Sequence, residues 1–236
     1  MPENISRGTI ANRILSHLSP EDFLLLQPHL EPTKLPLGKA LERRNRTIEH
    51  IYFIEHGLAS VVADGTQGRT IEVGVIGLEG MTGLAVVLGT DRSPNETYMQ
   101  LAGDALCMAA VNLRLRMQES ASLHRTFMNY GHVFLIQAGQ TALANGRGTI
   151  EERLARWLLM AHDRMNTDEL PLTHEFLATM LGVRRPGVTV ALKRLEKKGF
   201  IQTNRRAIEV IDREGLKKSS NGAYGVAEAE YRRIFA

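Results

Sequence analysis

Basic side chains are concentrated in one short stretch of the chain, from Gly182 to Arg206. The stretch holds eight Lys or Arg residues and one acidic residue, a net charge of +7, whereas the whole chain has a net charge of +3. The remaining residues therefore sum to −4. Arginine can grip guanine with two hydrogen bonds, and Lys or Arg can neutralise phosphates. The chemistry that this cluster predicts is binding of double-stranded DNA.

Two short helices are needed to present these side chains, and the sequence predicts both. Thr173 can cap the first helix, because its hydroxyl can accept an N–H of the first turn. Gly182 allows the chain to turn without a Cβ clash, and Pro186 fits the start of the second helix. Each helix has apolar residues at helical spacing that predict a buried face: Phe176, Leu177, Met180 and Leu181, then Val188, Ala191, Leu192 and Leu195. Together with the small Ala178 at the expected crossing point, this pattern indicates a helix-turn-helix.

A β-hairpin wing is expected after Gly199, because apolar residues alternate on both sides of a polar turn at 204–206. The recognition helix, at about residues 185–198, is expected to lie in the major groove. Arg184 and Arg185 are the expected base readers. The complete predicted DNA-binding set is Thr173, Arg184, Arg185, Pro186, Gly187, Thr189, Lys193, Arg194, Arg205 and Arg206. Thr189 would touch a thymine methyl or a phosphate, and the later basic residues would hold phosphates.

Length and composition indicate an ordinary globular protein of one or two domains. The chain has 236 residues, and no apolar run approaches the roughly 20 residues that span a bilayer. The first residues lack the layout of a secretory signal, so we expect a cytoplasmic protein without a membrane partner. Cys107 is the single cysteine and lies in an apolar run, which favours a buried thiol over a redox sensor.

Residues 31–112 alternate strand-like runs with Gly and polar turns, which predicts a β-barrel or jelly roll. Ser19 and Pro20 predict a helix start before it. The fold class expected is therefore α+β, with an N-terminal jelly roll, a long helix and a C-terminal winged helix-turn-helix. The expected domain bounds are 1–113, 114–145 and 146–236, the last including a C-terminal tail with a helix near 224–235.

The long helix, residues 114–145, is expected to pair two copies of the chain. Residues along it recur with heptad spacing, which is typical of a helix seam: Phe127, Gly131, Phe134, Ala138, Thr141 and Asn145. The alternative is that this face packs on its own domain. A two-fold dimer is favoured because helix-turn-helix proteins usually read two half-sites. Residues 145–149, with two glycines, are expected to form a hinge to the DNA-binding domain.

The order of these parts resembles the CRP/FNR family of bacterial transcription regulators, over about residues 19–212. The stretch LTHEFLATMLGVRRPGVTVALKRLEKKGFI carries the resemblance most specifically, and IYFIEHGLASVV supports it. The resemblance implies a cyclic-nucleotide-binding-type jelly roll, a homodimer, and RNA polymerase as a partner. It also places Arg185 at the family's base-reading Arg, Pro186 at a position where many relatives have Glu, and Gly187 where they have Ser or Thr. We therefore expect a different half-site from that of the cyclic-AMP activator.

The cyclic-nucleotide cassette of the family is altered in this chain. Gly83 stands where the resemblance places the ribose-binding Glu, and Glu96 stands near the position of the phosphate-binding Arg, with Arg92 several residues earlier. An acid would repel a phosphate, so we expect no cyclic-AMP binding of the usual kind. The expected pocket of an unidentified small-molecule effector comprises Gly80, Met81, Thr82, Gly83, Leu84, Glu96 and Thr97. The Gly-rich loop could instead be only a tight turn.

No nucleophile elbow, Walker loop or paired carboxylate spacing indicates catalysis, and no metal site is expected. The sequence leaves the cofactor unknown. The main hypothesis is therefore a dimeric, effector-controlled transcription regulator that binds palindromic DNA and is not an enzyme. Two alternatives remain open at this stage. One is a ligand-binding interaction module whose helix-turn-helix contacts protein, and the other is a cupin-like enzyme with an appended helix-turn-helix.

Overall fold

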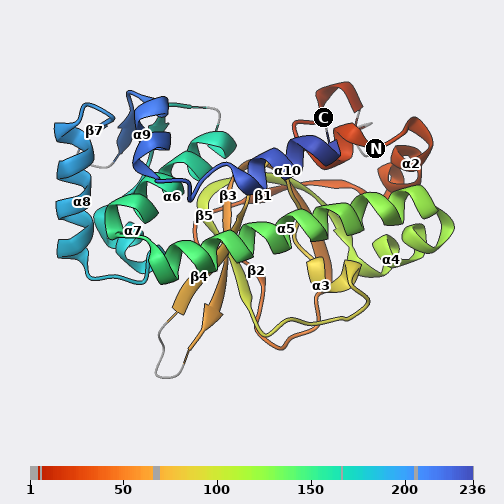
Figure 1. The fold of residues 1–236 in the computed structure, drawn as a ribbon. Coiled ribbons are helices and arrows are strands. Elements are labelled where there is room, and N and C mark those ends of the chain that lie inside the picture. The colour runs from red at the N-terminus through yellow and green to blue at the C-terminus, as the bar shows by residue number, and fades with distance from the viewer. Residues whose placement is uncertain (1–4, 6, 66–69, 166, 205–206, 236) are drawn as a thin grey trace. The chain divides into compact units, whose positions relative to one another are not determined.

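The computed structural model describes residues 5, 7–65, 70–165, 167–204 and 207–235 of the chain. The chain divides into two compact units. The first comprises Met1–Val61, Val75–Phe134 and Tyr231–Ala236, and the second comprises Val62–Gly74 and Leu135–Glu230. Figure 1 labels the helices and strands of both units.

The first unit is built from a β-sheet flanked by short helices. Its strands are β1 (Glu31–Leu35), β2 (Ala40–Glu42), β3 (His50–Asp64), β4 (Thr70–Ile76) and β5 (Glu96–Ala109), and the tip of the β3–β4 hairpin belongs to the second unit. Its helical segments are η1 (Arg7–Thr9), α1 (Arg13–His17), α2 (Pro20–Leu26), η2 (Gln27–His29), α3 (Leu84–Val87), α4 (Ala110–Glu119) and the first half of α5 (Ala121–Arg147). The predicted helix start at Ser19 is confirmed, since its side chain accepts the N–H of Asp22 at the start of α2.

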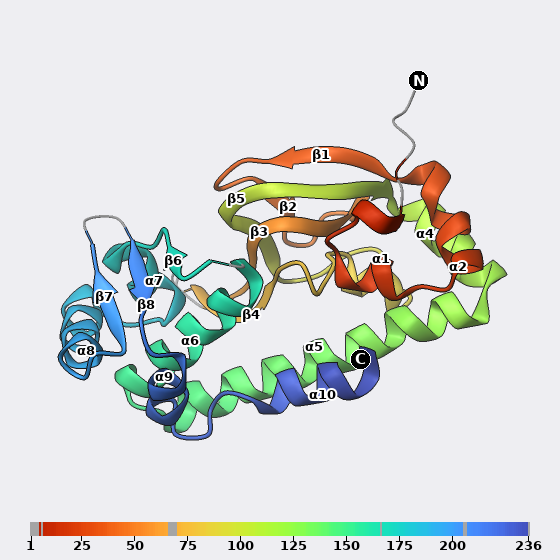
Figure 2. The same ribbon diagram turned by 90° about the horizontal axis from the view of Figure 1, so that it is seen from above.

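The strands pair in the order β1-β5-β3-β4, and β2 pairs with another part of β5. Figure 2 shows β1, β5 and β3 side by side. β1 and β5 run antiparallel, with Glu31 opposite Cys107 and Leu35 opposite Gly103. β3 is buried over most of its length, because its apolar residues meet the core on both faces. The α+β class with an N-terminal jelly roll is therefore confirmed.

The core of the first unit joins the sheet to the helices. Phe53 of β3 and Phe127 of α5 are both fully buried, with ring centroids 6.0 Å apart. Met81 and Leu113 are buried in the same cluster. Phe127 therefore completes the core of its own unit.

The helix expected over residues 114–145 is divided at Ser120. α4 ends at Glu119 and α5 begins at Ala121. The hydroxyl of Ser120 accepts the N–H of Leu123, and it also donates a hydrogen bond to the buried Asp22 at 2.5 Å. The Ser120 side chain thus caps the start of α5 and links the junction to α2. The expected single helix is therefore two helices, α4 and α5.

The second unit is mainly helical. It holds the second half of α5, then α6 (Ile150–Met165), α7 (His174–Met180), α8 (Arg185–Lys197) and α9 (Arg213–Ser219), together with β6 (Glu169–Leu170), β7 (Ile201–Thr203) and β8 (Ile208–Val210). The small sheet has the order β6-β8-β7, and β7 and β8 are antiparallel with Ile201 opposite Val210. The predicted wing is therefore confirmed as the β7–β8 hairpin.

The boundary between α5 and α6 lies at the end of the predicted hinge. α5 continues through Gly146 to Arg147, so only Gly148 and Thr149 lie between the helices. Thr149 and Glu152 form a reciprocal cap: the N–H of Thr149 donates to Glu152 Oε2 at 2.8 Å, and the N–H of Glu152 donates to Thr149 Oγ1.

The C-terminal tail ends in the helix that the sequence predicts. α10 spans Val226–Phe235. Within the first unit, the ring of Phe235 stacks on Tyr231 with centroids 4.8 Å apart and meets the edge of His17 at 5.4 Å. Among the residues described, none of the helices is long and apolar enough to cross a membrane.

Candidate functional site

Helices α7 and α8 form the helix-turn-helix for the local reasons that the sequence indicates. Thr173 accepts the N–H of Phe176 and so caps α7. Gly182 adopts a φ of +60°, which side chains other than glycine rarely tolerate, and it turns the chain between the helices. Ala178 is buried at 6 % exposure, as expected for a small residue at a helix crossing. The predicted apolar face of α8 is confirmed as buried.

The first turn of α8 presents two arginines to solvent. Arg184 is the N-cap residue, Arg185 begins the helix, and Pro186 follows at its first turn. All three are exposed. Arg185 Nε lies 3.9 Å from Glu175 Oε2, a long ion pair between two exposed side chains, which is weak in water. Both guanidinium groups are therefore accessible to a ligand of α8.

Gly187 and Thr189, both half-buried, make contacts within the second unit. A Cβ on Gly187 would lie 2.8 Å from Cδ1 of Ile150 in α6, so this position faces the second unit's own core. The hydroxyl of Thr189 is used within the helix-turn-helix: it donates to the carbonyl of Arg185 and lies 3.1 Å from His174 Nδ1. Gly187 is therefore a packing position, and the contact between Thr189 and His174 joins α7 to α8.

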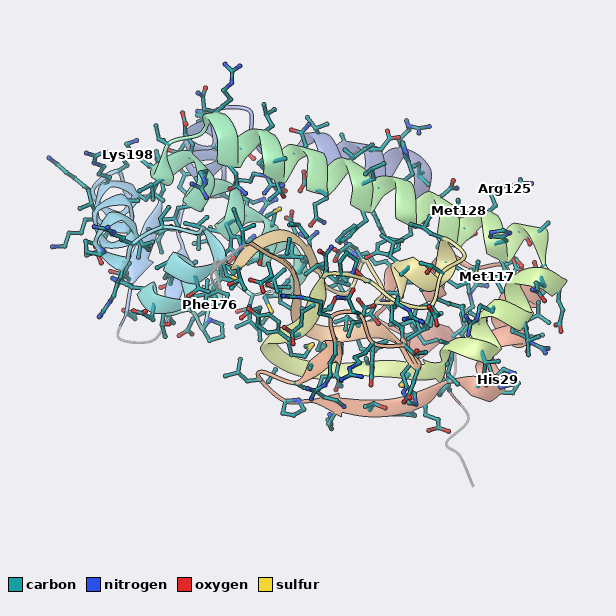
Figure 3. All side chains as sticks on the ribbon, turned by 90° about the horizontal axis from the view of Figure 1, so that it is seen from below. His29, Met117, Arg125, Met128, Phe176 and Lys198 are labelled. Carbon is teal, nitrogen blue, oxygen red and sulfur yellow. The ribbon has the colours of Figure 1, made fainter. Side chains whose placement is uncertain are left out.

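The later basic residues of α8 fall into two groups. Lys193 is exposed. Arg194 and Lys198, by contrast, lie beside Glu151 of α6, with nitrogen–oxygen distances of 3.9 and 2.5 Å. Figure 3 labels Lys198. Their charge is thus partly compensated within the unit. The predicted phosphate contacts Arg205 and Arg206 lie outside the described residues.

Sequence reasoning missed one apolar residue on the exposed face of α8. Val190 is 50 % exposed and follows Pro186 by one helical turn. A methyl group at this point suits contact with the C5-methyl of thymine. The signal was present in the sequence, because Val190 falls outside the buried stripe of Val188, Ala191 and Leu195.

Helix α6 anchors the helix-turn-helix through Trp157. The indole ring meets the edge of Phe176 in α7, with centroids 5.3 Å apart. Its N–H donates to Glu72 Oε1 at 2.8 Å, and both partners are buried. Glu72 belongs to the tip of the β3–β4 hairpin, which is part of the second unit. Trp157 thus contacts both the helix-turn-helix and the hairpin tip.

The face of α5 that was expected at a dimer interface packs in part against its own chain, which is the alternative that the sequence left open. Phe127 is buried in its own core, and a Cβ on Gly131 would lie 3.1 Å from Leu84 of the same unit. Thr141 is buried and accepts a hydrogen bond from Arg156 at 3.1 Å. Phe134 and Ala138 are only half-buried. The exposed face of α5 carries the residues that lie one position later in the chain: Met128, His132, Leu135, Gly139, Ala142 and Gly146.

A cavity of about 270 Å³ in the first unit contains part of the expected effector pocket. Met81, Thr82, Gly83 and Leu84 line it. Gly80 lies elsewhere: a Cβ there would overlap the hydroxyl of Tyr130. Neither Glu96 nor Thr97 is among the lining residues described. Arg92 lines the cavity, with its Nε 3.0 Å from Asp91 Oδ1.

The acid that faces this cavity is Glu42 of β2, not Glu96. Its carboxylate accepts the N–H of Gly83 and the hydroxyl of Thr97, the latter at 2.8 Å. Burial raises the pKa of Glu42, and these two hydrogen bonds lower it by less. No local pattern in the sequence marks Glu42, because β2 reaches the cavity only through its pairing with β5.

Comparisons with known proteins identify the second unit's domain. Residues 152–219 match the family described as the Crp-like helix-turn-helix domain. A search of curated protein sequences finds no match.

Several solved structures share the fold of this chain. FixK2 from Bradyrhizobium japonicum is 17 % identical with a TM-score of 0.71, and the match covers 80 % of this chain and 96 % of that one. A CRP-family regulator from Thermus thermophilus is 19 % identical with a TM-score of 0.66, covering 82 % and 98 %. The c-di-GMP-responsive regulator CLP from Xanthomonas campestris is 15 % identical with a TM-score of 0.63, covering 81 % and 99 %. The resemblance to CRP/FNR regulators is thus confirmed in the helix-turn-helix domain and in the fold.

Proposed function

We propose that this protein is a transcription regulator that binds palindromic DNA as a homodimer under the control of a small molecule bound in the first unit. The observation that carries the proposal is the pair of exposed arginines at the start of α8, on a helix-turn-helix whose cap, turn and buried face are all in place. The start of a recognition helix is the part that contacts base edges in such domains. Such a protein acts on DNA in the cytoplasm, with RNA polymerase as a partner.

The two arginines have the role of base readers in this proposal. Arg184 and Arg185 each reach guanine O6 and N7, while Val190 contacts a thymine methyl. Lys193 holds a phosphate and fixes the register of the helix. Arg205 and Arg206 of the wing add phosphate contacts. Thr173 and Pro186 support the same surface as the cap of α7 and the first turn of α8.

Dimerisation is assigned to the exposed stripe of α5. Met128, His132, Leu135, Gly139 and Ala142 follow the alternation of four and three residues that brings side chains to one helix seam. Met128 is labelled on α5 in Figure 3. The small residues Gly139 and Ala142 allow a second copy of the helix to come close. A two-fold dimer would place the two recognition helices about 34 Å apart, one turn of DNA.

The test is selection from a random duplex pool with the full-length protein, followed by sequencing, with and without cyclic AMP. We expect an enriched palindrome that does not depend on the nucleotide. Affinity for the selected duplex is then measured by fluorescence anisotropy from low to high salt, where a steep loss indicates phosphate contacts.

A matched pair of variants makes this test specific to α8. R184A/R185A removes two exposed charges from the recognition helix, and K217A/K218A removes two from α9. We expect only the first variant to lose selection of the palindrome. If the wild type shows neither an enriched sequence nor salt-dependent affinity, the proposal is wrong.

A further inference from the structure

The cavity of the first unit has walls that are mostly apolar. Val61, Ile76, Met81, Leu84, Leu88 and Phe134 line it, and its volume is about 270 Å³. Pockets of this kind bind ligands mainly by burying apolar surface, with a few polar groups that set orientation. The polar groups around this cavity therefore decide which chemical class of ligand fits.

One of the polar groups that line the cavity is the carboxylate of Glu42. It is buried at 9 % exposure and is held by the Gly83 N–H and the Thr97 hydroxyl. A carboxylate has about four acceptor positions on its two oxygens. Two are used by these partners, so Glu42 keeps the capacity to accept a further hydrogen bond from a group in the cavity.

The backbone donor of the Gly-rich turn is already engaged. Gly83 has a φ of +80°, and a Cβ there would overlap Cδ1 of Ile51. Glycine is therefore required by packing against β3, and its N–H is satisfied by the chain's own acid. An anionic ligand would find a carboxylate where it needs a donor.

The one cation among the described residues that line the cavity is already paired with an acid. Arg92 is the one basic side chain among the described residues that line the cavity. Its guanidinium is paired with Asp91 through two hydrogen bonds of 3.0 and 3.4 Å, and 59 % of its side chain is exposed. A ligand anion would therefore meet Arg92 only in competition with Asp91, and any ion pair that it formed with this exposed side chain would contribute little.

We propose that this cavity binds a small, uncharged and largely apolar molecule that donates a hydrogen bond to Glu42, and that it rejects anions, cyclic nucleotides included. This ligand class rests on the proposed function in one respect, which is that the bound molecule acts as the effector of the regulator. A hydroxyl or amide N–H on the ligand contacts the carboxylate, while the ligand body fills the space between Leu84, Leu88 and Phe134.

The test uses a matched pair of probes with the full-length protein. Cyclohexylmethanol and cyclohexanecarboxylate share an apolar ring and differ in charge, and cyclic AMP is the third probe. Binding is measured by ligand-observed NMR and calorimetry without DNA. We expect saturable binding of the alcohol, with the carboxylate weaker by about tenfold or more, the equivalent of one hydrogen bond to a charged group.

Two variants assign the binding to this cavity. L88W fills the cavity from a residue that is 58 % exposed, and L24W places the same side chain on α2 at a residue that is 61 % exposed. We expect L88W to abolish alcohol binding and L24W to leave it unchanged. E42Q keeps an acceptor for the Gly83 N–H and a donor toward Thr97, so it should fold, and it should reduce the preference for the alcohol over the carboxylate.

Several outcomes would overturn the inference. They are equal or tighter binding of the carboxylate, micromolar binding of cyclic AMP, absence of alcohol binding, or alcohol binding that L88W leaves intact. The proposed function is tested separately by DNA binding without any probe. Alcohol binding with no DNA binding would contradict only the proposed function, and DNA binding with no alcohol binding would contradict only the ligand class.

Discussion

The indole N–H of Trp157 donates a hydrogen bond to Glu72 Oε1 at 2.8 Å, inside the second unit and away from water. This bond fixes the tip of the β3–β4 hairpin to α6. Because the same indole packs against Phe176 of α7, one side chain connects the hairpin tip to the helix-turn-helix. Loss of the acceptor leaves a buried N–H without its partner.

Replacement of Glu72 by leucine should destabilise the second unit. A buried donor that loses its acceptor costs about 1–3 kcal/mol of the free energy of unfolding. E72Q, which keeps an acceptor oxygen, should cost less than E72L. Urea unfolding followed by circular dichroism measures both changes, and the fluorescence of Trp157, the single tryptophan, reports the local environment. Equal stability of E72L and wild type would show that the bond contributes nothing.

Substitutions on α8 should separate base reading from phosphate binding. R185A should weaken binding to the selected duplex by about 1–3 kcal/mol and relax the preference at one base pair of each half-site. K193A should weaken binding to all duplexes alike and reduce the salt slope by about one for each phosphate that is no longer neutralised. Anisotropy titrations against single-base variants of the duplex measure both effects. The interpretation fails if K193A, and not R185A, changes the base preference.

A charge on the exposed face of α5 should separate the dimer. Leu135 is 70 % exposed in the single chain, and in a two-fold seam L135D would bury an unpaired carboxylate from each copy. Such burial costs several kcal/mol, so the dissociation constant of the dimer should rise by about a hundredfold or more. L37D is the control, because Leu37 has the same 70 % exposure and lies in a loop. Sedimentation velocity over a concentration series distinguishes the two. A dimer that resists L135D would place the interface elsewhere.

The ion-paired Asp104 should make stability depend on pH. Burial raises its pKa, but the hydrogen bonds from Lys34 and His56, at 2.8 and 2.7 Å, outweigh burial and lower the pKa below the ordinary 3.8. A lowered pKa means that the folded state favours the charged form. The stabilisation is therefore present above pH 3.8 and is lost as the pH falls through the lowered pKa.

The matching variant for this prediction is D104N. Its unfolding free energy should lie below that of the wild type near neutral pH, and the two should converge in acid. Urea titrations at a series of pH values give both curves. A constant gap across the range would show that the charge of Asp104 is not the cause.

The helix-turn-helix could be predicted because its signals are local. Thr173, Gly182 and Pro186 each act on the backbone within one turn of themselves, so the sequence alone specifies the cap, the reversal and the second start. The wing follows for the same reason, since a hairpin needs only a turn between two alternating runs.

Features that depend on distant contacts were harder to predict. Phe127, which the sequence placed on an outward seam of α5, packs instead on Phe53, which lies 74 positions earlier in the chain. Likewise, Glu42 reaches the cavity through strand pairing, and no spacing rule connects it to Gly83. Periodicity shows that a helix has two faces, but the rest of the fold decides which face is buried.

The contact between Gly187 and Ile150 limits how this chain can change its targets. A Cβ at position 187 would lie 2.8 Å from Cδ1 of Ile150, so a larger residue here requires that the Ile150 side chain moves. Residues 184, 185 and 190 are exposed, so substitutions there change the surface of α8, whereas a change at 187 also involves Ile150 of α6. If α8 reads DNA as proposed, the order in which substitutions accumulate would depend in part on a packing contact between α8 and α6.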